Sequence, residues 1–511
     1  MKKLKTFLLL LTSILLGVIG LFLYYAVDVL IKFFPLDNPE AVVFTITNVV
    51  GDAYKVVWIL LEPCVQQTME FSVCAISLLA LISMVVGLVY CKKKSISPKK
   101  CSLHQLVRIA LIPFFFSVAL IDVVIWGCFF YRIPIVPCIK AYGAFLDDSP
   151  HYNPLYEIDY VFPDSVSVVF GQKKNLILIF LESMEYNFQD SKNGGSLSEN
   201  QIPEITNLMN ENISFKPGGV TVKGTGWTMG ETVAKTCALP LIMPIRSSDG
   251  IRYFFKNAVC LTDILHKNGY TIELLQGSDA EFASMNYFVK KHGVPQENIY
   301  DLQYYERMGV KVLETNFFSS VKDGFMYAEM KKILSNKTEQ LNKPWMLWFY
   351  TLDTHGPYGR LDSNCVEFPK DLKMEDQYPY VLRCASKQVS DFIDWAEKQS
   401  WFENTVIAVM GDHPGMASLE VIGFTQEKLD RYWLNFFVNS SVAKRSDNRK
   451  FTSFDMFPTI LEAMGAKIDG RALGLGRSLF SGEPTLLEKY GKDSLNVLLG
   501  TKSSLYDSFW K

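Results

Sequence analysis

The chain has 511 residues, 49% of them hydrophobic, and its mean hydropathy of +0.12 is high for a soluble protein. A formal net charge of −2 gives no basic footprint for a nucleic acid, so we expect no nucleic-acid partner. The length allows more than one domain, and the apolar excess lies in the first 130 residues.

Three segments of this N-terminal region are apolar for about the 20 residues that cross a bilayer, which predicts three membrane helices. They are residues 7–26, 71–90 and 109–130. A fourth candidate, residues 41–61, is interrupted by Gly51, Asp52 and Lys55, and its remaining uncharged run is too short to cross. Asp122 falls inside the third segment, where it either packs against a neighbouring helix or has a function.

Lysines predict the topology of these helices. One cluster precedes the first helix and a second, near residues 92–100, lies between the second and the third, so the positive-inside rule places both in the cytoplasm. The first helix is expected to stay as an anchor, since its apolar run is longer than that of a usual signal peptide. We therefore predict a multi-pass membrane protein with everything after residue 130 on the outer side of the membrane.

The chain is accordingly divided into a transmembrane region, 1–130, a connector, 131–160, and an extracytoplasmic domain, 161–511. Disulfides persist outside the cytoplasm. Proximity in the sequence favours pairing Cys237 with Cys260 and Cys365 with Cys384, which leaves Cys138 single, although sequence alone does not fix connectivity.

From about residue 160, short apolar runs alternate with amphipathic helical stretches, the pattern of a parallel sheet covered by helices on both faces. Four of these runs end in polar or ionisable residues. They are "NLILIFLES", "YTIELLQGSD", "PWMLWFYTLDTH" and "TVIAVMGDH". Ligands of open α/β sheets bind at the carboxyl ends of the strands, so these end residues are expected to converge in one crevice.

Glu182, Asp412 and His413 stand at two of these strand ends and form an oxygen-rich set with one nitrogen. Such a set suits one divalent cation, Mn²⁺ or Mg²⁺ first and Zn²⁺ as the alternative. Thr228 would complete the set, because a hydroxyl beside a cation loses its proton more readily and becomes a nucleophile.

Thr228 lies in "GTGWTMGETVAKTCALPL", at the expected start of a helix. Thr228 and Glu231 have the spacing of a capping box, so the threonine is a helix cap, a nucleophile or both. Trp227 beside it either flanks substrate or packs in the core.

Five motifs in order resemble the membrane-anchored phosphoglycerol transferases of the alkaline phosphatase and sulfatase superfamily. They are "LIFLESMEYNF", "GTGWTMGETVAKTCALPL", "LDTHGPY", "GDHPGM" and "FDMFPTILEAMG". The resemblance covers about residues 165–480 and is nearest to the enzymes that decorate periplasmic glucans with glycerophosphate, with lipoteichoic acid synthase more distant. It implies a sulfatase-like α/β domain behind an α-helical membrane anchor. The resemblance also implies that the protein is a multi-pass protein of the bacterial cytoplasmic (inner) membrane, with the α/β domain on the periplasmic side.

Carried over to this sequence, the resemblance implies that Glu182, Thr228, Asp412 and His413 form the metal site and that Thr228 is the nucleophile. It also implies that His355 is an active-site histidine near the transferred phosphate.

The segment "EFASMNYFVKKHGV" resembles a family segment that would bring Asn286, Lys290 or His292 toward the phosphate. This sequence departs from the commonest form of that segment by having Ser284 in place of glycine, which weakens the expectation.

The function implied is transfer of phosphoglycerol from phosphatidylglycerol to an envelope glycan or glycolipid through a phosphothreonine-type intermediate, with release of diacylglycerol. The alternatives are a phosphoethanolamine transferase, a membrane-tethered sulfatase or phosphodiesterase, and a non-catalytic envelope sensor. A sulfatase is disfavoured because "CALPL" at Cys237 lacks the signature from which sulfatases make their formylglycine.

Overall fold

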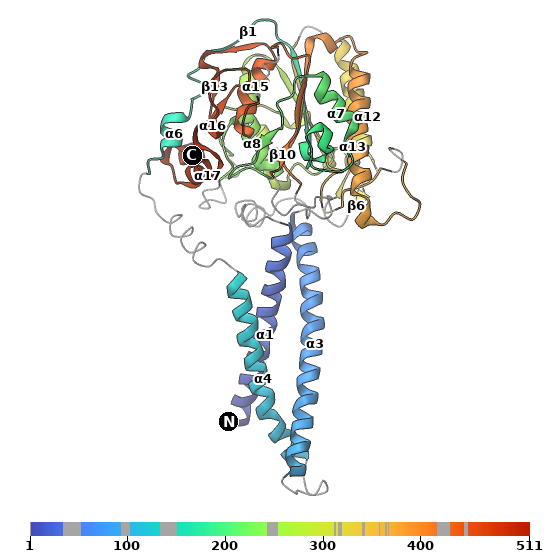
Figure 1. The fold of residues 1–511 in the computed structure, drawn as a ribbon, viewed down its shortest axis with the longest axis vertical. Helices are drawn as coiled ribbons and strands as arrows, with labels where there is room; N and C mark the ends of the chain where they lie inside the picture. The colour runs from blue at the N-terminus through green and yellow to red at the C-terminus, as the bar shows by residue number, and fades with distance from the viewer. Residues whose placement is uncertain are drawn as a thin grey trace. The chain divides into compact units, whose positions relative to one another are not determined.

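The computed structural model describes residues 2–33, 53–93, 103–132, 151–242, 254–310, 313–314, 319–339, 343–356, 358–362, 365, 367–415, 430–443 and 448–510. They fall into two compact units, the second of which contains the described residues from 151 to 510 (Figure 1). The predicted domain bounds stay a prediction. Most of the predicted connector, residues 133–150, lies outside the described residues, and so does Cys138.

The first unit consists of three helices, one over each segment predicted to cross the membrane. They are α1 (Lys2–Phe33), α3 (Ala53–Lys93) and α4 (Leu103–Arg132). Within the described residues, none of the helices combines the length and the apolar character that a membrane crossing requires. Of the fourth candidate, residues 53–61 form the start of α3 and residues 41–52 lie outside the description.

Asp122 of α4 packs against α1, which is one of the two alternatives left open by the sequence. Its Oδ2 accepts a hydrogen bond of 2.7 Å from the Ser13 hydroxyl. A Cβ added at Gly17 would lie 2.3 Å from Asp122 Oδ1, so this glycine makes room for the carboxylate.

The second unit is built on a six-stranded sheet of order β11-β9-β2-β8-β4-β5. Five strands run parallel and β11, at one edge, runs antiparallel to β9. The bounds are β2 (Asn175–Leu181), β4 (Thr271–Gln276), β5 (Ile299–Tyr300), β8 (Trp345–Tyr350), β9 (Thr405–Gly411) and β11 (Asn435–Val438). All four predicted strands are therefore present and adjacent, and the α/β fold class is confirmed.

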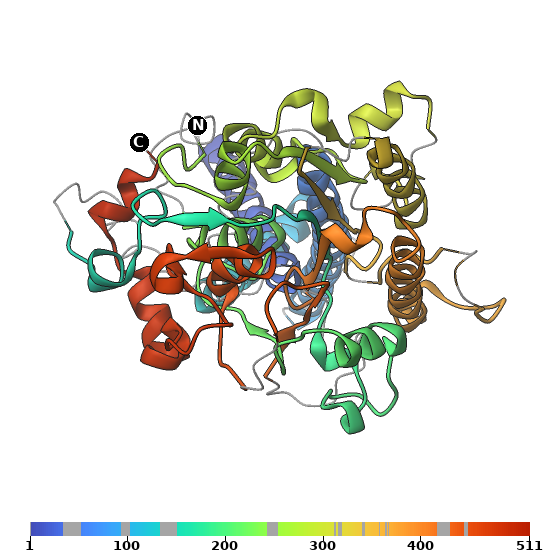
Figure 2. The same ribbon diagram turned by 90° about the horizontal axis from the view of Figure 1, so that it is seen from above.

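Alternation along β2 explains why helices cover both faces of the sheet. Leu176, Leu178 and Phe180 join one buried cluster, whereas Ile177 and Ile179 join another. Since neighbouring side chains of a strand point to opposite faces, a strand buried on both faces is apolar throughout. Figure 2 shows the helices on the two sides.

The helices that supply the first cluster are α8 (Thr228–Cys237), α9 (Leu261–Lys267), α10 (Met285–Lys291) and α15 (Met456–Ala463). Those that supply the second are α7 (Pro203–Glu211), α11 (Leu302–Arg307), α12 (Asp323–Ser335) and α13 (Tyr378–Ala396). The shorter helices are α6 (Pro154–Asp159), α16 (Leu486–Tyr490), α17 (Lys492–Gly500) and α18 (Ser504–Ser508).

Four two-stranded pairs complete the described fold. They are β1 (Val168–Phe170) with β12 (Ala466–Ile468), β3 (Gly219–Val220) with β10 (Tyr432–Trp433), β6 (Leu313–Glu314) with β7 (Ser319–Ser320), and β13 (Ala472–Leu473) with β14 (Gly476–Arg477).

Both disulfides expected from sequence proximity are formed. Cys237, the last residue of α8, is bonded to Cys260, and Cys365 is bonded to Cys384. The first bond ties the end of α8 to the residue before α9, on one face of the sheet. It also occupies the thiol of Cys237, which leaves no free cysteine there for a formylglycine.

Candidate active site

The register of two central strands places the first two site residues side by side. In the parallel pair of β2 and β9, Leu181 lies opposite Gly411, so Glu182 and Asp412 are the next residues of neighbouring strands. A Cβ at position 411 would lie 1.9 Å from the carbonyl oxygen of Met184, so the chain leaving β2 can pass this point only because residue 411 is glycine.

Glu182, Asp412 and His413 meet at this edge of the sheet. One ligand-type atom of each lies within 4.8 Å of the others, and all three side chains are buried. The sequence prediction that these residues converge is therefore correct in its geometry.

The hydrogen bonds of Asp412 and His413 occupy one polar atom of each side chain and leave the other one facing the middle of the donor set. Asp412 Oδ1 accepts from the backbone amides of Ser183 and His413, both at 2.7 Å, while Oδ2 is buried and has no hydrogen-bond partner in the described part of the chain. His413 Nδ1 donates to the carbonyl of Pro414 at 2.8 Å, because a carbonyl only accepts. Its Nε2 thus keeps its lone pair, 3.4 Å from Asp412 Oδ2 and 3.8 Å from Glu182 Oε1.

The electrostatics of the group call for a positive charge. Burial and the neighbouring Asp412 carboxylate raise the pKa of Glu182. Burial alone would lower the pKa of His413, but Asp412 and Glu182 outweigh it and raise that pKa. Two buried carboxylates that face each other repel unless a cation lies between them. The buried Asp412 Oδ2, the Glu182 carboxylate and the His413 Nε2 are the oxygen and nitrogen donors that bind a divalent cation, so this donor set fits such an ion.

Thr228 is brought to the same place from α8. Its hydroxyl oxygen lies 3.4 Å from Glu182 Oε2 and 3.4 Å from His413 Nε2, and the residue is half-buried. The turn before it requires glycine at position 226, whose φ is +86°. The hydroxyl therefore faces the donor set directly.

The expected capping box is not formed, and that part of the sequence interpretation is wrong. Trp227 occupies the cap position of α8, with no side-chain cap hydrogen bond. Glu231 is fully buried, and its Oε1 accepts from the amide of Gly226 at 3.1 Å instead of from that of Thr228. The physical reason is Lys235, one turn further along, which draws the carboxylate into the core.

Lys235 and Glu231 link the nucleophile loop to the donor set. The Lys235 ammonium, which is fully buried, donates 2.6 Å bonds to Glu231 Oε2 and to the backbone carbonyl of Asp412, and it lies 4.2 Å from the centre of the Trp433 ring. Ser453 donates a further hydrogen bond to Glu231. These residues position the site without lining it.

We expect Lys235→Met to lower both stability and turnover. Without the lysine, the Glu231 carboxylate is left buried and unpaired, which should lower the free energy of unfolding by about 3–5 kcal/mol. The substitution also removes the hydrogen bond to the Asp412 carbonyl. The double variant Glu231→Gln/Lys235→Met should regain most of the stability, since no buried charge is left. If the ion pair positions the site, the kcat of the double variant should stay roughly 100-fold below that of the wild type, because moving site residues by about 1 Å has an effect of that size. Recovery of kcat together with stability would show a purely structural role.

His355 follows β8, the strand on the other side of β2. Two threonines of this loop hold Glu182: Thr351 Oγ1 accepts from its amide at 3.0 Å and Thr354 Oγ1 donates to its carbonyl at 2.5 Å. His355 Nδ1 donates to the carbonyl of Gly356 at 2.9 Å. Burial, with a smaller contribution from the neighbouring His413, lowers the pKa of His355 to about 4, so the imidazole is neutral at pH 7.

The other strand ends do not join the donor set. Asp353 is paired with Arg360, whose Nε donates a 2.6 Å hydrogen bond to the carboxylate. Asp279 accepts from the amide of Glu281 at 2.8 Å and closes a turn. Acidic residues after a strand serve here as often to shape loops as to bind.

Two of the weaker substrate-binding candidates already have partners. Lys290 is exposed and bonds Gln296. His292 is buried, 2.7 Å from Asp263 and packed against the Phe288 ring, so its ring is already engaged. Cys260 also lies beside this ring, but its sulfur is held in the disulfide with Cys237 and is no metal ligand.

Asn286 is buried, and its role stays a prediction. Ser284, which stands where the family usually has glycine, has a φ of +62°, the left-handed region that glycine favours. Trp227 is buried in the core, which is the second of its two alternatives.

Several residues that shape the site were not found from the sequence. They are Ser183, Lys235, Thr351 and Thr354. Lys235 did carry a signal, because a lysine one turn after a glutamate, in a helix that also contains Val233, Ala234 and Cys237, indicates an ion pair.

A family model described as Sulfatase matches residues 174–466, more than half of the chain and all of the donor set. The chain belongs to the sulfatase family. Two curated relatives are the proteins named phosphoglycerol transferase I of Escherichia fergusonii, 27% identical over 315 residues, and of Citrobacter koseri, 28% identical over 314 residues. These matches cover 61% and 60% of this chain but 39% of each relative, so the chain spans about two fifths of their length.

Two solved structures are similar to this sulfatase-family chain at 20% identity and a TM-score of 0.48. One is a protein of the alkaline phosphatase superfamily from Vibrio parahaemolyticus, with 67% of this chain and 77% of that chain covered. The other is the lipoteichoic acid synthase LtaP from Listeria monocytogenes, with 62% and 79% covered.

Proposed function

We propose that this protein transfers phosphoglycerol from phosphatidylglycerol to a glycan or glycolipid of the cell envelope. The observation that carries the proposal is the Thr228 hydroxyl, 3.4 Å from both a carboxylate and an imidazole of a buried, cation-type donor set. The relatives named phosphoglycerol transferase I support the choice of group transferred.

The reaction would run in two displacements. Thr228 Oγ1 attacks phosphorus, the bond from phosphorus to the diacylglycerol oxygen breaks, and the proton lost by Thr228 ends on that oxygen. An acceptor hydroxyl then attacks the same phosphorus, the bond to Thr228 breaks, and the acceptor's proton ends on Thr228. His355 is the proposed proton carrier, because its ring is neutral at pH 7 and, with Nδ1 donating to Gly356, Nε2 is the nitrogen that can accept a proton.

Glu182, Asp412 and His413 would hold one divalent cation, Mn²⁺ or Mg²⁺ first and Zn²⁺ as the alternative. The cation would lower the pKa of the Thr228 hydroxyl and offset the charge on the phosphoryl oxygens. Ser183 holds two members of the donor set in place. Its backbone amide donates a hydrogen bond to Asp412 Oδ1, and its hydroxyl donates one of 2.6 Å to Glu182 Oε1.

A lipid donor fits the sequence-based prediction of a membrane anchor with its following domain on the periplasmic side. Membrane vesicles that carry the full chain and phosphatidylglycerol labelled in the headgroup test both parts. Right-side-out vesicles should transfer the label to an added gluco-oligosaccharide, which does not cross membranes, and should release diacylglycerol in equal amount. Inside-out vesicles should do neither. Diacylglycerol release without labelled glycan would instead indicate hydrolysis, and activity only in inside-out vesicles would contradict the topology.

A further inference from the structure

A large cavity borders the loop before Thr228 and the loop after His413. It has a volume of about 1060 Å³, as large as a small-molecule site, and its wall includes Gly226, two residues before Thr228, and Pro414, directly after His413. The cavity therefore reaches both loops that carry site residues, although Thr228 itself is not part of its wall. None of the steps proposed above uses the cavity.

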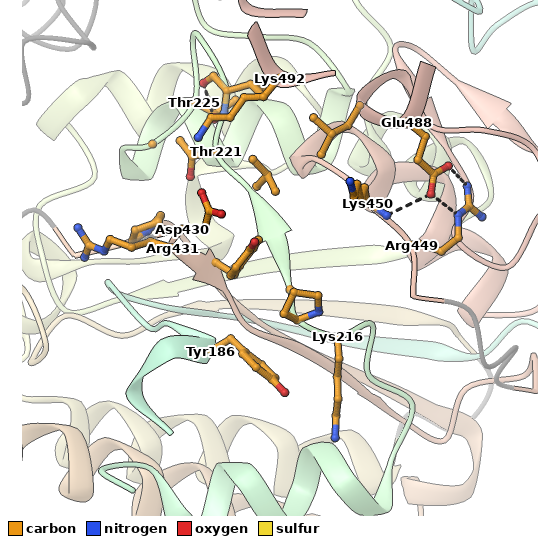
Figure 3. Close-up of a pocket in the computed structure, with 18 of the residues that line it drawn as sticks. Tyr186, Lys216, Thr221, Thr225, Asp430, Arg431, Arg449, Lys450, Glu488 and Lys492 are labelled. Carbon is orange, nitrogen blue, oxygen red and sulfur yellow. Dashed lines mark hydrogen bonds and ion pairs between the residues drawn. The ribbon is translucent and has the colours of Figure 1, made fainter. Parts of the chain in front are cut away.

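The cavity is rich in positive charge. The described residues of its wall include six lysines and arginines and two carboxylates. Four of the cations are engaged. Arg431 Nε donates to Glu185 at 2.8 Å, Arg449 Nε to Glu488 at 2.8 Å and Lys216 Nζ to Asn210 at 2.6 Å, and Lys223 also has a partner. In Figure 3 the Arg431 side chain points away from Lys492, in keeping with that contact.

Lys450 and Lys492 are different. Both are exposed, and neither ammonium group makes a hydrogen bond or ion pair with the described residues. Lys450 follows Arg449 on the loop before Thr452, and Lys492 begins α17, so two separate elements bring them to one cavity (Figure 3).

Polar groups without charge accompany these lysines. Figure 3 shows Lys492 extending toward the side chains of Thr221 and Thr225, and the Thr221 hydroxyl has no hydrogen-bond partner among the described residues. The rings of Tyr186 and Tyr432 also line the wall. Hydroxyl, ammonium and aromatic groups around one cavity suit a polyhydroxylated anion better than acyl chains, which need an apolar lining.

We propose that this cavity is the acceptor subsite and that Lys450 and Lys492 select an anionic glycan, an oligosaccharide that already carries a phosphodiester. The inference rests on the proposed transfer of phosphoglycerol and adds the charge of the acceptor. The donor's phosphate belongs at Thr228, so a second anion bound by the two lysines comes from the acceptor. Substitution would then proceed faster on glycans that are already modified.

The test compares two acceptors with the purified full chain and labelled phosphatidylglycerol. One is a gluco-oligosaccharide of fixed length, and the other is the same oligosaccharide bearing one phosphoglycerol group. The KM of the wild type should be roughly five- to tenfold lower for the anionic acceptor, and added salt should shrink the difference because the lysines are exposed. Lys450→Gln/Lys492→Gln should bring the ratio of the two KM values to about one.

Lys467→Gln is the matched control, an exposed lysine on β12 outside the cavity wall, and it should keep the wild-type ratio. Equal KM values in the wild type would overturn the inference and leave the proposed function intact. A higher KM for phosphatidylglycerol in the double variant, with the acceptor ratio unchanged, would assign the lysines to the donor and also overturn it. Transfer to neither acceptor would reject the proposed function itself.

Discussion

Thr228→Ala should abolish diacylglycerol release from phosphatidylglycerol, with a loss on the order of 10³-fold or more. Among the described residues, Thr228 and Ser183 bring hydroxyl groups to the donor set, and that of Ser183 is committed to Glu182 at 2.6 Å. The hydroxyls of Thr351 and Thr354 contact Glu182 too, but they are bonded to its backbone amide and carbonyl. The assay is release of labelled diacylglycerol by the purified full chain.

Stability distinguishes a lost nucleophile from a damaged fold. Because Thr228 makes no capping hydrogen bond, its replacement by alanine should cost less than the roughly 1 kcal/mol of a lost cap. The melting temperature should therefore stay close to that of the wild type. Thr501→Ala, at an exposed threonine bonded to Val497 in α17, is the matched control and should release diacylglycerol normally.

Two further observations would fix the role of this hydroxyl. Thr228→Ser keeps the oxygen and should keep part of the rate. Without an acceptor, the wild type should accumulate phosphoglycerol on the peptide that contains Thr228, seen by mass spectrometry after rapid quenching. An adduct on another residue would move the nucleophile there, and normal release by the alanine variant would eliminate Thr228.

Exhaustive chelation should reduce transfer to about 1% or less of the untreated rate, and Mn²⁺ or Mg²⁺ should restore it. The reason is the geometry of Glu182 and Asp412, two buried carboxylates whose ligand atoms lie within 4.8 Å of each other and of His413. Without a cation they repel each other and leave the Thr228 hydroxyl at its ordinary acidity. Full activity after chelation would contradict the metal site.

Binding gives a readout independent of activity. Adding Mn²⁺ to the chelated wild type should raise its melting temperature, because an ion that binds only the folded state stabilises it. Asp412→Asn removes a charge at the unpartnered Oδ2 and should suppress this shift. Asp391→Asn changes a carboxylate that is half exposed and paired with Lys387, so it should show the wild-type shift.

The central strands of the fold could be predicted from the sequence because strand formation depends on residues that are neighbours along the chain. After a polar first residue, β2 and β9 are apolar to their ends, and an apolar run that ends abruptly in Glu182 or in Asp412 and His413 marks the carboxyl end of a buried parallel strand. The same rule brought Asp353 and Asp279 forward as candidates, and the structure instead uses them in a loop pair and a turn.

By itself, then, the sequence determined which strands form and which residues stand at their ends, since burial and side-chain alternation depend on neighbours along the chain. The tertiary structure decided what those residues contact. Glu231 had the spacing of a cap partner, but hydrogen bonds from Lys235 and Gly226 hold its carboxylate in another position. Lys450 and Lys492 line one cavity although 42 positions separate them in the sequence. Contacts between distant segments depend on how strands and helices pack in space, which a local pattern does not encode.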